Sequence, residues 1–188
     1  MFCGSSPGSD PAYAEAARSL GRTLAEANVR LVFGGGHVGL MGVVSNAVLE
    51  AGGEATGVIP RFLVERELAH AGLSDLRIVG TMHERKAMMA DLSEGFIALP
   101  GGTGTLEEFF EVLTWAQLGE HRKPCGILNV AGYYDPLISI FDHMVRKDFL
   151  SASNRSLVLV EAEPAALIKS FEEYEPPART KWIDRSET

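Results

Sequence analysis

The chain has few cysteines and no long apolar run, and these absences exclude several classes of protein. Cys3 and Cys125 are too few and too isolated for a disulfide framework or a zinc site, so we interpret them as reduced thiols. No apolar run approaches the length of a membrane span, and the N-terminus lacks the basic and then apolar order of a signal peptide. We therefore expect a cytoplasmic protein with no membrane partner.

The chain also has fewer basic residues than acidic ones. The 17 Lys and Arg residues stand against 25 Asp and Glu residues, which gives a net charge of −8 and argues against a nucleic acid as the partner. The five histidines are scattered, and none lies at a metal-binding spacing from another histidine or a cysteine. The sequence thus predicts a site without a metal or a cofactor.

Glycine, in contrast, is abundant, and it follows short apolar segments that alternate with helical patterns along all 188 residues. This alternation predicts an α/β fold in which helices cover both faces of a parallel sheet, in a single domain over residues 1–174 with a tail over 175–188. We expect strands over residues 30–33, 55–59, 76–79, 95–99, 125–129 and 157–160. Met1-Phe2-Cys3 resembles the end of a further strand whose beginning is missing, so we expect the chain to be slightly shortened there.

Three glycine-rich loops follow expected strands, at Gly4, Gly34 and Gly101. The carboxyl ends of parallel strands are where ligands bind on such sheets, so the three loops can converge on one cleft. The first loop, Gly4-Ser5-Ser6-Pro7-Gly8, is equally compatible with an anion site and with a simple turn that precedes a helix capped by Asp10.

The second loop contains Gly34, Gly36 and Gly39 in the G-x-G-x-x-G spacing of a dinucleotide site. That fingerprint also requires an acidic residue at the end of the following strand, where this chain has Pro60-Arg61. We therefore favour close backbone approach to a smaller ligand over binding of NAD.

The third loop, Pro100-Gly101-Gly102-Thr103-Gly104-Thr105, joins the apolar segment 95–99 to a helix that we expect to start at Thr105. Glycines allow backbone N–H groups to surround an anion, and the start of a helix adds positive potential. This stretch is a candidate phosphate cradle, with Glu107 and Glu108 in the first helical turn. No G-K-[ST] follows, which argues against a nucleoside triphosphatase.

An expected helix over residues 81–92 places Met82, Arg85, Met89 and Leu92 on one stripe. An arginine within an apolar stripe either extends outward between the methionines or points into a pocket that holds an anion or a carboxylate. We favour the pocket for Arg85 and expect Lys86 on the neighbouring face, nearer the rim.

Glu108 also has two interpretations. Thr105-Leu106-Glu107-Glu108 fits a capping box, in which Glu108 only returns a hydrogen bond to the helix start. A carboxylate kept ionised by the helix N-terminus could instead stabilise an oxocarbenium-like sugar and orient a water molecule, next to a phosphate that positions the sugar.

Three motifs carry a resemblance to a known family: residues 34–42 (GGGHVGLMG), 82–86 (MHERK) and 100–108 (PGGTGTLEE). Together they resemble the Lonely Guy (LOG) family of cytokinin riboside 5′-monophosphate phosphoribohydrolases, whose members are often mislabelled as lysine decarboxylases. The resemblance covers essentially the whole chain. It implies a Rossmann-like, doubly wound sheet, a homodimer, and a metal-free hydrolysis of N6-substituted AMP to the free base and ribose 5-phosphate.

The resemblance also implies roles for individual residues. Arg85 and Glu108 would be the catalytic pair. Glu67, which by charge pattern alone belongs to a solvated run, would contact the substrate. The complete set of residues expected to bind substrate is Glu67, Arg85, Lys86, Gly101, Gly102, Thr103, Gly104, Thr105, Leu106, Glu107, Thr114, Gly4, Ser5, Gly35, Gly36 and Met82.

Two other functions remain open at this point. One is a broader nucleosidase that acts on AMP or other purine 5′-monophosphates. The other is a non-catalytic carrier of a nucleotide or cofactor, which could keep the glycine loops but would not need Arg85 and Glu108. Both residues are present, which favours an enzyme.

Overall fold

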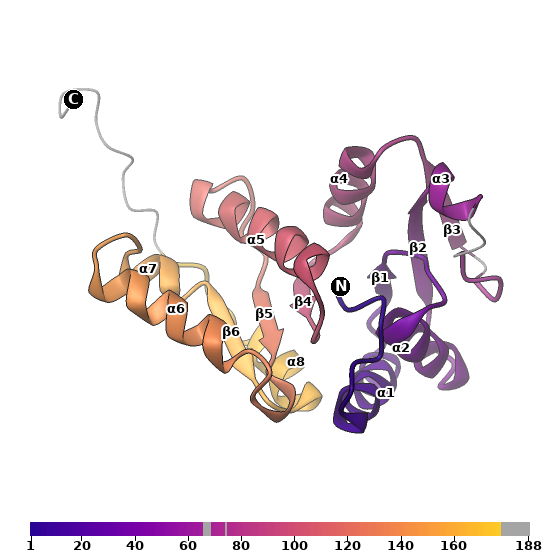
Figure 1. The fold of residues 1–188 in the computed structure, drawn as a ribbon, viewed down its shortest axis with the longest axis horizontal. Helices are drawn as coiled ribbons and strands as arrows, with labels where there is room; N and C mark the ends of the chain where they lie inside the picture. The colour runs from indigo at the N-terminus through magenta and orange to yellow at the C-terminus, as the bar shows by residue number, and fades with distance from the viewer. Residues whose placement is uncertain (66–68, 74, 178–188) are drawn as a thin grey trace.

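A computed structural model describes residues 1–65, 69–73 and 75–177. Helices and strands alternate along this part of the chain (Figure 1). The elements in order are α1 (Pro11–Glu26), β1 (Leu31–Phe33), α2 (Gly39–Glu50), β2 (Ala55–Pro60), α3 (Arg61–Val64), β3 (Asp75–Val79), α4 (Met82–Leu92), β4 (Phe96–Ala98), α5 (Thr103–Leu118), β5 (Cys125–Leu128), η1 (Val130–Gly132), α6 (Asp135–Arg146), α7 (Ala152–Arg155), β6 (Val158–Glu161) and α8 (Pro164–Glu172).

The strands of the described residues form two parallel sheets, with the orders β1-β2-β3 and β4-β5-β6. The first residues of the chain join them. Phe2 forms a parallel bridge with Ala98 beside β4, and the amino group of Met1 donates a hydrogen bond to the carbonyl of Val32 in β1, at 2.7 Å. Residues 1 and 2 therefore lie between β1 and β4. The strand order proceeds outward in both directions from this point, as expected for a doubly wound sheet.

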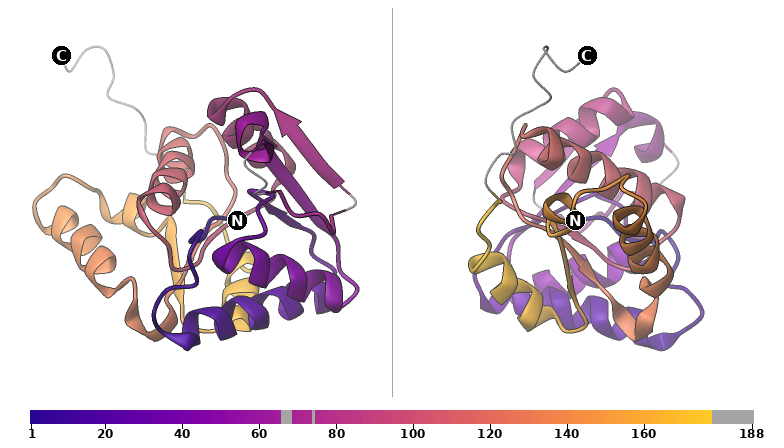
Figure 2. Two further views of the ribbon diagram at one scale, coloured as in Figure 1. Left: turned by 45° about the vertical axis from the view of Figure 1, so that its right-hand side comes forward. Right: turned by 90° about the vertical axis from the view of Figure 1, so that its left-hand side faces the viewer.

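Apolar side chains alternate between the two faces of these sheets and build two cores. Phe96 and Ala98 contribute to one core with residues of α4, α5 and α6, whereas Ile97 and Leu99 contribute to the other with residues of α1, α2 and α8. Figure 2 shows the same division, with α1, α2 and α8 on one side of the strands and α4 and α5 on the other. The expected sheet with helices on both faces is thus confirmed.

Local signals account for most helix boundaries. Asp10 caps α1 by accepting a hydrogen bond from the amide of Ala12, and Pro11 occupies the first helical position. Gly119 ends α5 in the left-handed conformation, with a φ of 79°. The expected start of this helix was wrong, because α5 begins at Thr103 with Gly102 as its N-cap residue.

The described helices include none that is long and apolar enough to cross a membrane.

Candidate functional site

The loop between β4 and α5 has the geometry expected of an anion cradle. A Cβ atom on Gly101 would lie 2.1 Å from Oγ1 of Thr105 and 2.7 Å from the amide nitrogen of Gly4, so only glycine fits there. Gly102, Thr103 and Gly104 are exposed. Gly102 has no side chain with which to cap the helix, so the first N–H groups of α5 remain available to a bound anion.

The first loop and the start of α2 meet this cradle. The amide of Gly4 donates a hydrogen bond to the carbonyl of Pro100, at 3.0 Å, and the Gly4 carbonyl accepts one from the amide of Leu40. A Cβ atom on Gly39 would lie 2.3 Å from the backbone of Ser5. Three segments that are distant in sequence therefore converge at the carboxyl ends of the central strands, and exposed Ser5 lies at their meeting point.

Gly35 and Gly36 lie elsewhere. Both are buried, the Gly35 carbonyl accepts a hydrogen bond from the amide of His70, and Gly36 bridges to Ala69. A Cβ atom on Gly35 would also press against β2, at 3.3 Å from Ile59. Packing against β2 and residues 69–70 accounts for both glycines without a ligand, and their role in substrate binding stays a prediction.

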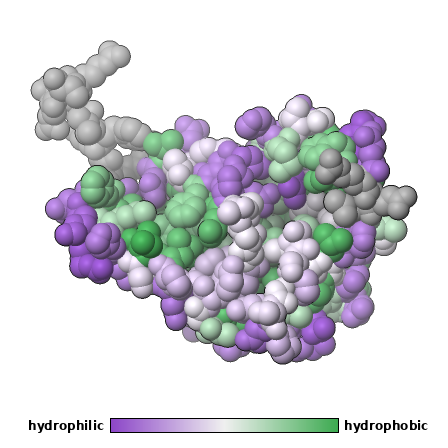
Figure 3. All heavy atoms as spheres, viewed as in Figure 1, coloured by the Kyte–Doolittle hydropathy of each residue, from purple (hydrophilic) through white to green (hydrophobic). Residues whose placement is uncertain are grey.

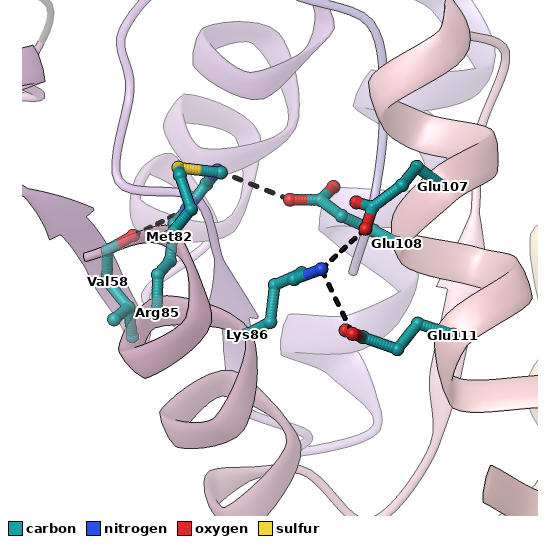
Figure 4. A network of polar contacts seen from close by, with 7 residues as sticks. All are labelled: Val58, Met82, Arg85, Lys86, Glu107, Glu108 and Glu111. Atoms are coloured by element: carbon teal, nitrogen blue, oxygen red, sulfur yellow. Dashed lines mark hydrogen bonds and ion pairs between the residues drawn. The ribbon is translucent and has the colours of Figure 1, made fainter.

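Arg85 points inward from α4, as expected from the apolar stripe. Its side chain is 11% exposed; Nε donates to the carbonyl of Val58 in β2 at 3.1 Å, and Nη1 lies 3.2 Å from Oε1 of Glu108 (Figure 4). The same Nη1 is 3.9 Å from the sulfur of Met82. The alternative in which Arg85 extends out to solvent is wrong, because the guanidinium is held between β2 and α5.

Glu108 projects from the second turn of α5 towards this guanidinium, and its side chain is 12% exposed. The proposed capping box with Thr105 is wrong, since Thr105 lies inside the helix and Gly102 is the N-cap residue. The helix start is not the main influence on this carboxyl group: burial raises the pKa of Glu108, and the positive charge of Arg85 opposes that rise.

Lys86 is buried rather than at the rim, with 9% of its side chain exposed. Its Nζ atom lies 2.5 Å from Oε1 of Glu107 and 3.0 Å from Oε1 of Glu111, as drawn in Figure 4. Hydrogen bonds from Lys86 to these carboxylates raise its pKa, Glu107 most strongly, so the ammonium group is charged at neutral pH. Two adjacent ion pairs thus link α4 to α5.

The remaining expected residues differ in their placement. Thr114 follows Glu111 by three residues on the same side of α5, is exposed, and donates its hydroxyl to the carbonyl of Phe110. Leu106 is half-buried against the core. Glu67 lies outside the described residues, so its predicted contact with substrate stays a prediction.

Three residues at the site were missed by the sequence analysis. Glu111 pairs with Lys86, and its Oε2 atom is buried without a hydrogen-bond partner among the described residues. A Cβ atom on Gly34 would lie 2.0 Å from Nη2 of Arg85, so this glycine provides the space for the guanidinium. Tyr133 donates its hydroxyl to the carbonyl of Gly101. Of these three, only Gly34 could have been found from the sequence. It belongs to a glycine run that we interpreted as close backbone approach to a ligand.

Comparison with known proteins identifies the family. Residues 41–171 match the model of a family described as "Possible lysine decarboxylase". The chain is 50% identical over 176 residues to the cytokinin riboside 5′-monophosphate phosphoribohydrolase LOG7 of Arabidopsis thaliana, covering 94% of this chain and 81% of the relative. The chain belongs to the Lonely Guy family. A second member, the cytokinin riboside 5′-monophosphate phosphoribohydrolase of Rhodococcoides fascians, is 51% identical over 161 residues, covering 85% of this chain and 81% of that relative.

Solved structures support the same fold at lower identity. The molybdenum cofactor binding protein of Rippkaea orientalis matches with a TM-score of 0.67 and 22% identity, over 91% of this chain and 93% of that one. The molybdenum cofactor carrier protein of Chlamydomonas reinhardtii matches with a TM-score of 0.67 and 21% identity, over 92% and 94%. At these identities the likeness shows that the Lonely Guy chain and the carriers share a fold.

The decarboxylase description of the family model does not fit the one lysine at this site. A lysine that forms a Schiff base with a carbonyl cofactor needs a neutral amine, which usually means a lowered pKa. In this Lonely Guy protein the pKa of Lys86 is raised, because Glu107 and Glu111 stabilise its ammonium form.

Proposed function

We propose that this protein hydrolyses the N-glycosidic bond of N6-substituted AMP to release the free cytokinin base and ribose 5-phosphate. The observation that carries the proposal is the buried ion pair between Arg85 of α4 and Glu108 of α5, at 3.2 Å, since Glu108 lies on the helix that the exposed glycine cradle begins. The two curated relatives named above are phosphoribohydrolases with this substrate class in their names.

The geometry supports a division of labour. The amides of Gly102 to Thr105 would bind the 5′-phosphate and supply binding energy remote from the reacting carbon. Glu108, in the next turn of α5, would stabilise the positive charge that develops on the sugar and orient a water molecule. The water oxygen bonds to the anomeric carbon and the bond to the base nitrogen breaks; one water proton ends on the base, and the other stays on the new anomeric hydroxyl of ribose 5-phosphate.

Arg85 would orient Glu108 and hold down its pKa. Burial alone favours the protonated carboxyl, which could not stabilise a cation, and the guanidinium opposes that effect. Because Nε of Arg85 is fixed by the carbonyl of Val58, the guanidinium position is set by β2 rather than by the ligand. A carrier protein on the same fold would not need a carboxylate fixed in this way beside a reacting sugar carbon.

The direct test is release of ribose 5-phosphate from N6-isopentenyl-AMP and from AMP. We expect release from the N6-substituted nucleotide, and loss of roughly 100-fold or more of kcat in Glu108→Gln. Glu120→Gln is the matched control, because Glu120 is an exposed glutamate beyond the end of α5.

Each negative result has a separate meaning. No release from either nucleotide would contradict the hydrolase and favour the carrier. Faster turnover of AMP would contradict the cytokinin substrate and favour the broader nucleosidase. Full activity of Glu108→Gln would contradict its role in the reaction.

We also propose that residues 1–174 form the hydrolase domain. The protein would act as a homodimer in the cytoplasm. Apolar residues gather over α5 and α6 on the face shown in Figure 3. Leu118 at the end of α5, Ile140 in α6 and Phe149 beyond α6 have exposures of 43%, 49% and 88%. Exposed apolar side chains of this size favour burial against another protein surface. Light scattering of the purified chain tests the dimer, and the mass of a monomer at micromolar concentration would contradict it.

A further inference from the structure

Three consecutive carbonyl groups lead into the cradle, and each accepts a hydrogen bond from a different donor. The Leu99 carbonyl accepts from the hydroxyl of Tyr134, that of Pro100 from the amide of Gly4, and that of Gly101 from the hydroxyl of Tyr133. A cradle for a phosphate must turn its carbonyl oxygens away from the ligand, because they carry partial negative charge.

Of these three carbonyl groups, that of Gly101 belongs to the peptide group that rotates most easily. The peptide group between Gly101 and Gly102 lies between two glycines, whose backbone rotations cost less than those of any other residue pair. If this peptide rotated by half a turn, the Gly101 carbonyl would take the place of the Gly102 N–H group and would repel a phosphate. The hydroxyl of Tyr133, 2.6 Å from the carbonyl oxygen, opposes that rotation.

The segment before α6 is shaped to present this hydroxyl. Ala131 and Gly132 both have left-handed backbones, with φ angles of 50° and 72°. Ala131 is one of three non-glycine residues with a positive φ in the described part of the chain. Asn129 accepts a hydrogen bond from the amide of Tyr134 and donates one to Asp135. A strained turn held by side chains on both sides is typical of segments that position a functional group.

The ring of Tyr133 is also fixed. It contacts Tyr13 of α1 edge to face at 5.5 Å between ring centroids, and Tyr134 at 4.9 Å. Its side chain nevertheless remains at the surface, with the residue 39% exposed. The adjacent Tyr134 is 2% exposed, and its hydroxyl reaches the end of β4 instead of the glycine pair.

We infer that Tyr133 is a positioning residue of the phosphate cradle: its hydroxyl holds the Gly101–Gly102 peptide with the N–H group towards the bound 5′-phosphate. This inference rests on the proposed function for the presence of a phosphate at this loop. Tyr133 acts through the backbone of Gly101, so removal of its hydroxyl weakens binding of the phosphate and leaves the Arg85–Glu108 pair in place.

The test is calorimetric binding of ribose 5-phosphate, which contains the phosphate and no base. Tyr133→Phe keeps the ring contacts with Tyr13 and removes only the hydroxyl. We expect its Kd for ribose 5-phosphate to rise about tenfold. Tyr134→Phe is the matched control, and we expect it to lower the Tm while changing the Kd less than threefold.

The outcomes separate the two proposals. A Kd of Tyr133→Phe equal to that of the wild type, with or without a lower Tm, overturns the inference, because Tyr133 is then only a packing residue. An equal loss of affinity in Tyr134→Phe also overturns it, since the effect is then not local to Gly101. Failure of the wild type to bind ribose 5-phosphate overturns the proposed cradle, and the inference with it.

Discussion

Gly104 offers a sharp test of the cradle because the fold itself does not require a glycine at this position. It lies in the first turn of α5, and a Cβ atom built there meets no atom within 4 Å apart from the chain neighbours and backbone of its own helix. Gly104→Ala should therefore stabilise the protein by about 0.5 to 1 kcal/mol, since alanine favours the helix and restricts the unfolded chain. For a chain of this size the gain corresponds to a Tm increase of roughly 1 to 4 °C.

Although Gly104→Ala should be more stable, we expect it to bind the substrate more weakly. The open space at Gly104 is where a phosphate would approach the first N–H groups of α5, and a methyl group would occupy part of it. We expect KM for N6-isopentenyl-AMP to rise at least about tenfold, which corresponds to about 1.4 kcal/mol of lost binding. Thermal unfolding and steady-state kinetics of the same preparation measure both effects.

Ser139→Ala is the matched control for Gly104→Ala. Ser139 is an exposed residue of α6, so alanine should raise helix stability there without any change in KM. If Gly104→Ala raised the Tm and left KM unchanged, the phosphate would not bind at this turn, and the reasoning from the empty space would be refuted.

Three further predictions concern the two ion pairs. Gly34→Ala should lower kcat/KM by roughly 100-fold with a folded circular dichroism spectrum, because a Cβ atom would lie 2.0 Å from Nη2 of Arg85. Glu111→Gln should raise KM several-fold, since it removes the inner anchor of Lys86. The acid limb of the pH profile of kcat/KM should lie above pH 4.5, because burial raises the pKa of Glu108 in the free enzyme and activity requires its ionised form, which is lost as the pH falls through that pKa.

The controls for these predictions come from the same network. Glu107 makes the shorter contact with Lys86, but 56% of its side chain is accessible against 26% for Glu111, so water can replace that contact and Glu107→Gln should disturb Lys86 less. Equal effects of the two substitutions would contradict an anchoring role for Glu111. An acid limb below pH 4.5 would show that Glu108 is not the titrating group, and unchanged kinetics in Gly34→Ala would show that Arg85 has room to move.

The fold was accessible from the sequence because its signals are local. Short apolar segments bounded by glycine predict buried parallel strands, and Asp10 followed by Pro11 predicts the start of α1. The apolar stripe around Arg85 also predicted its inward direction correctly, because Met89 and Leu92 of the same stripe pack in the core.

The errors arose where the answer depends on contacts between distant segments. The sequence contains threonines at both 103 and 105, and the capping-box pattern favoured the second, whereas the helix starts at Thr103 with Gly102 as its N-cap residue, next to the contact of Gly101 with Gly4. Burial of Lys86 and the contact of Tyr133 with the cradle follow from the packing of α5 against α4 and against the segment before α6. No spacing within one segment encodes such contacts.

The pairing of Phe2 with Ala98 has a consequence for how the protein is made. The ribosome adds Ala98 long after Phe2, so the centre of the sheet cannot close while the first half of the chain is emerging. Pairing of such distant segments in parallel is intrinsically slow, because the intervening loop must be ordered before the contact forms. The cradle at Gly101 contacts Gly4 directly, so it reaches its final form only after this late closure. Ligand binding during refolding should therefore report a step that follows this closure, not an early one.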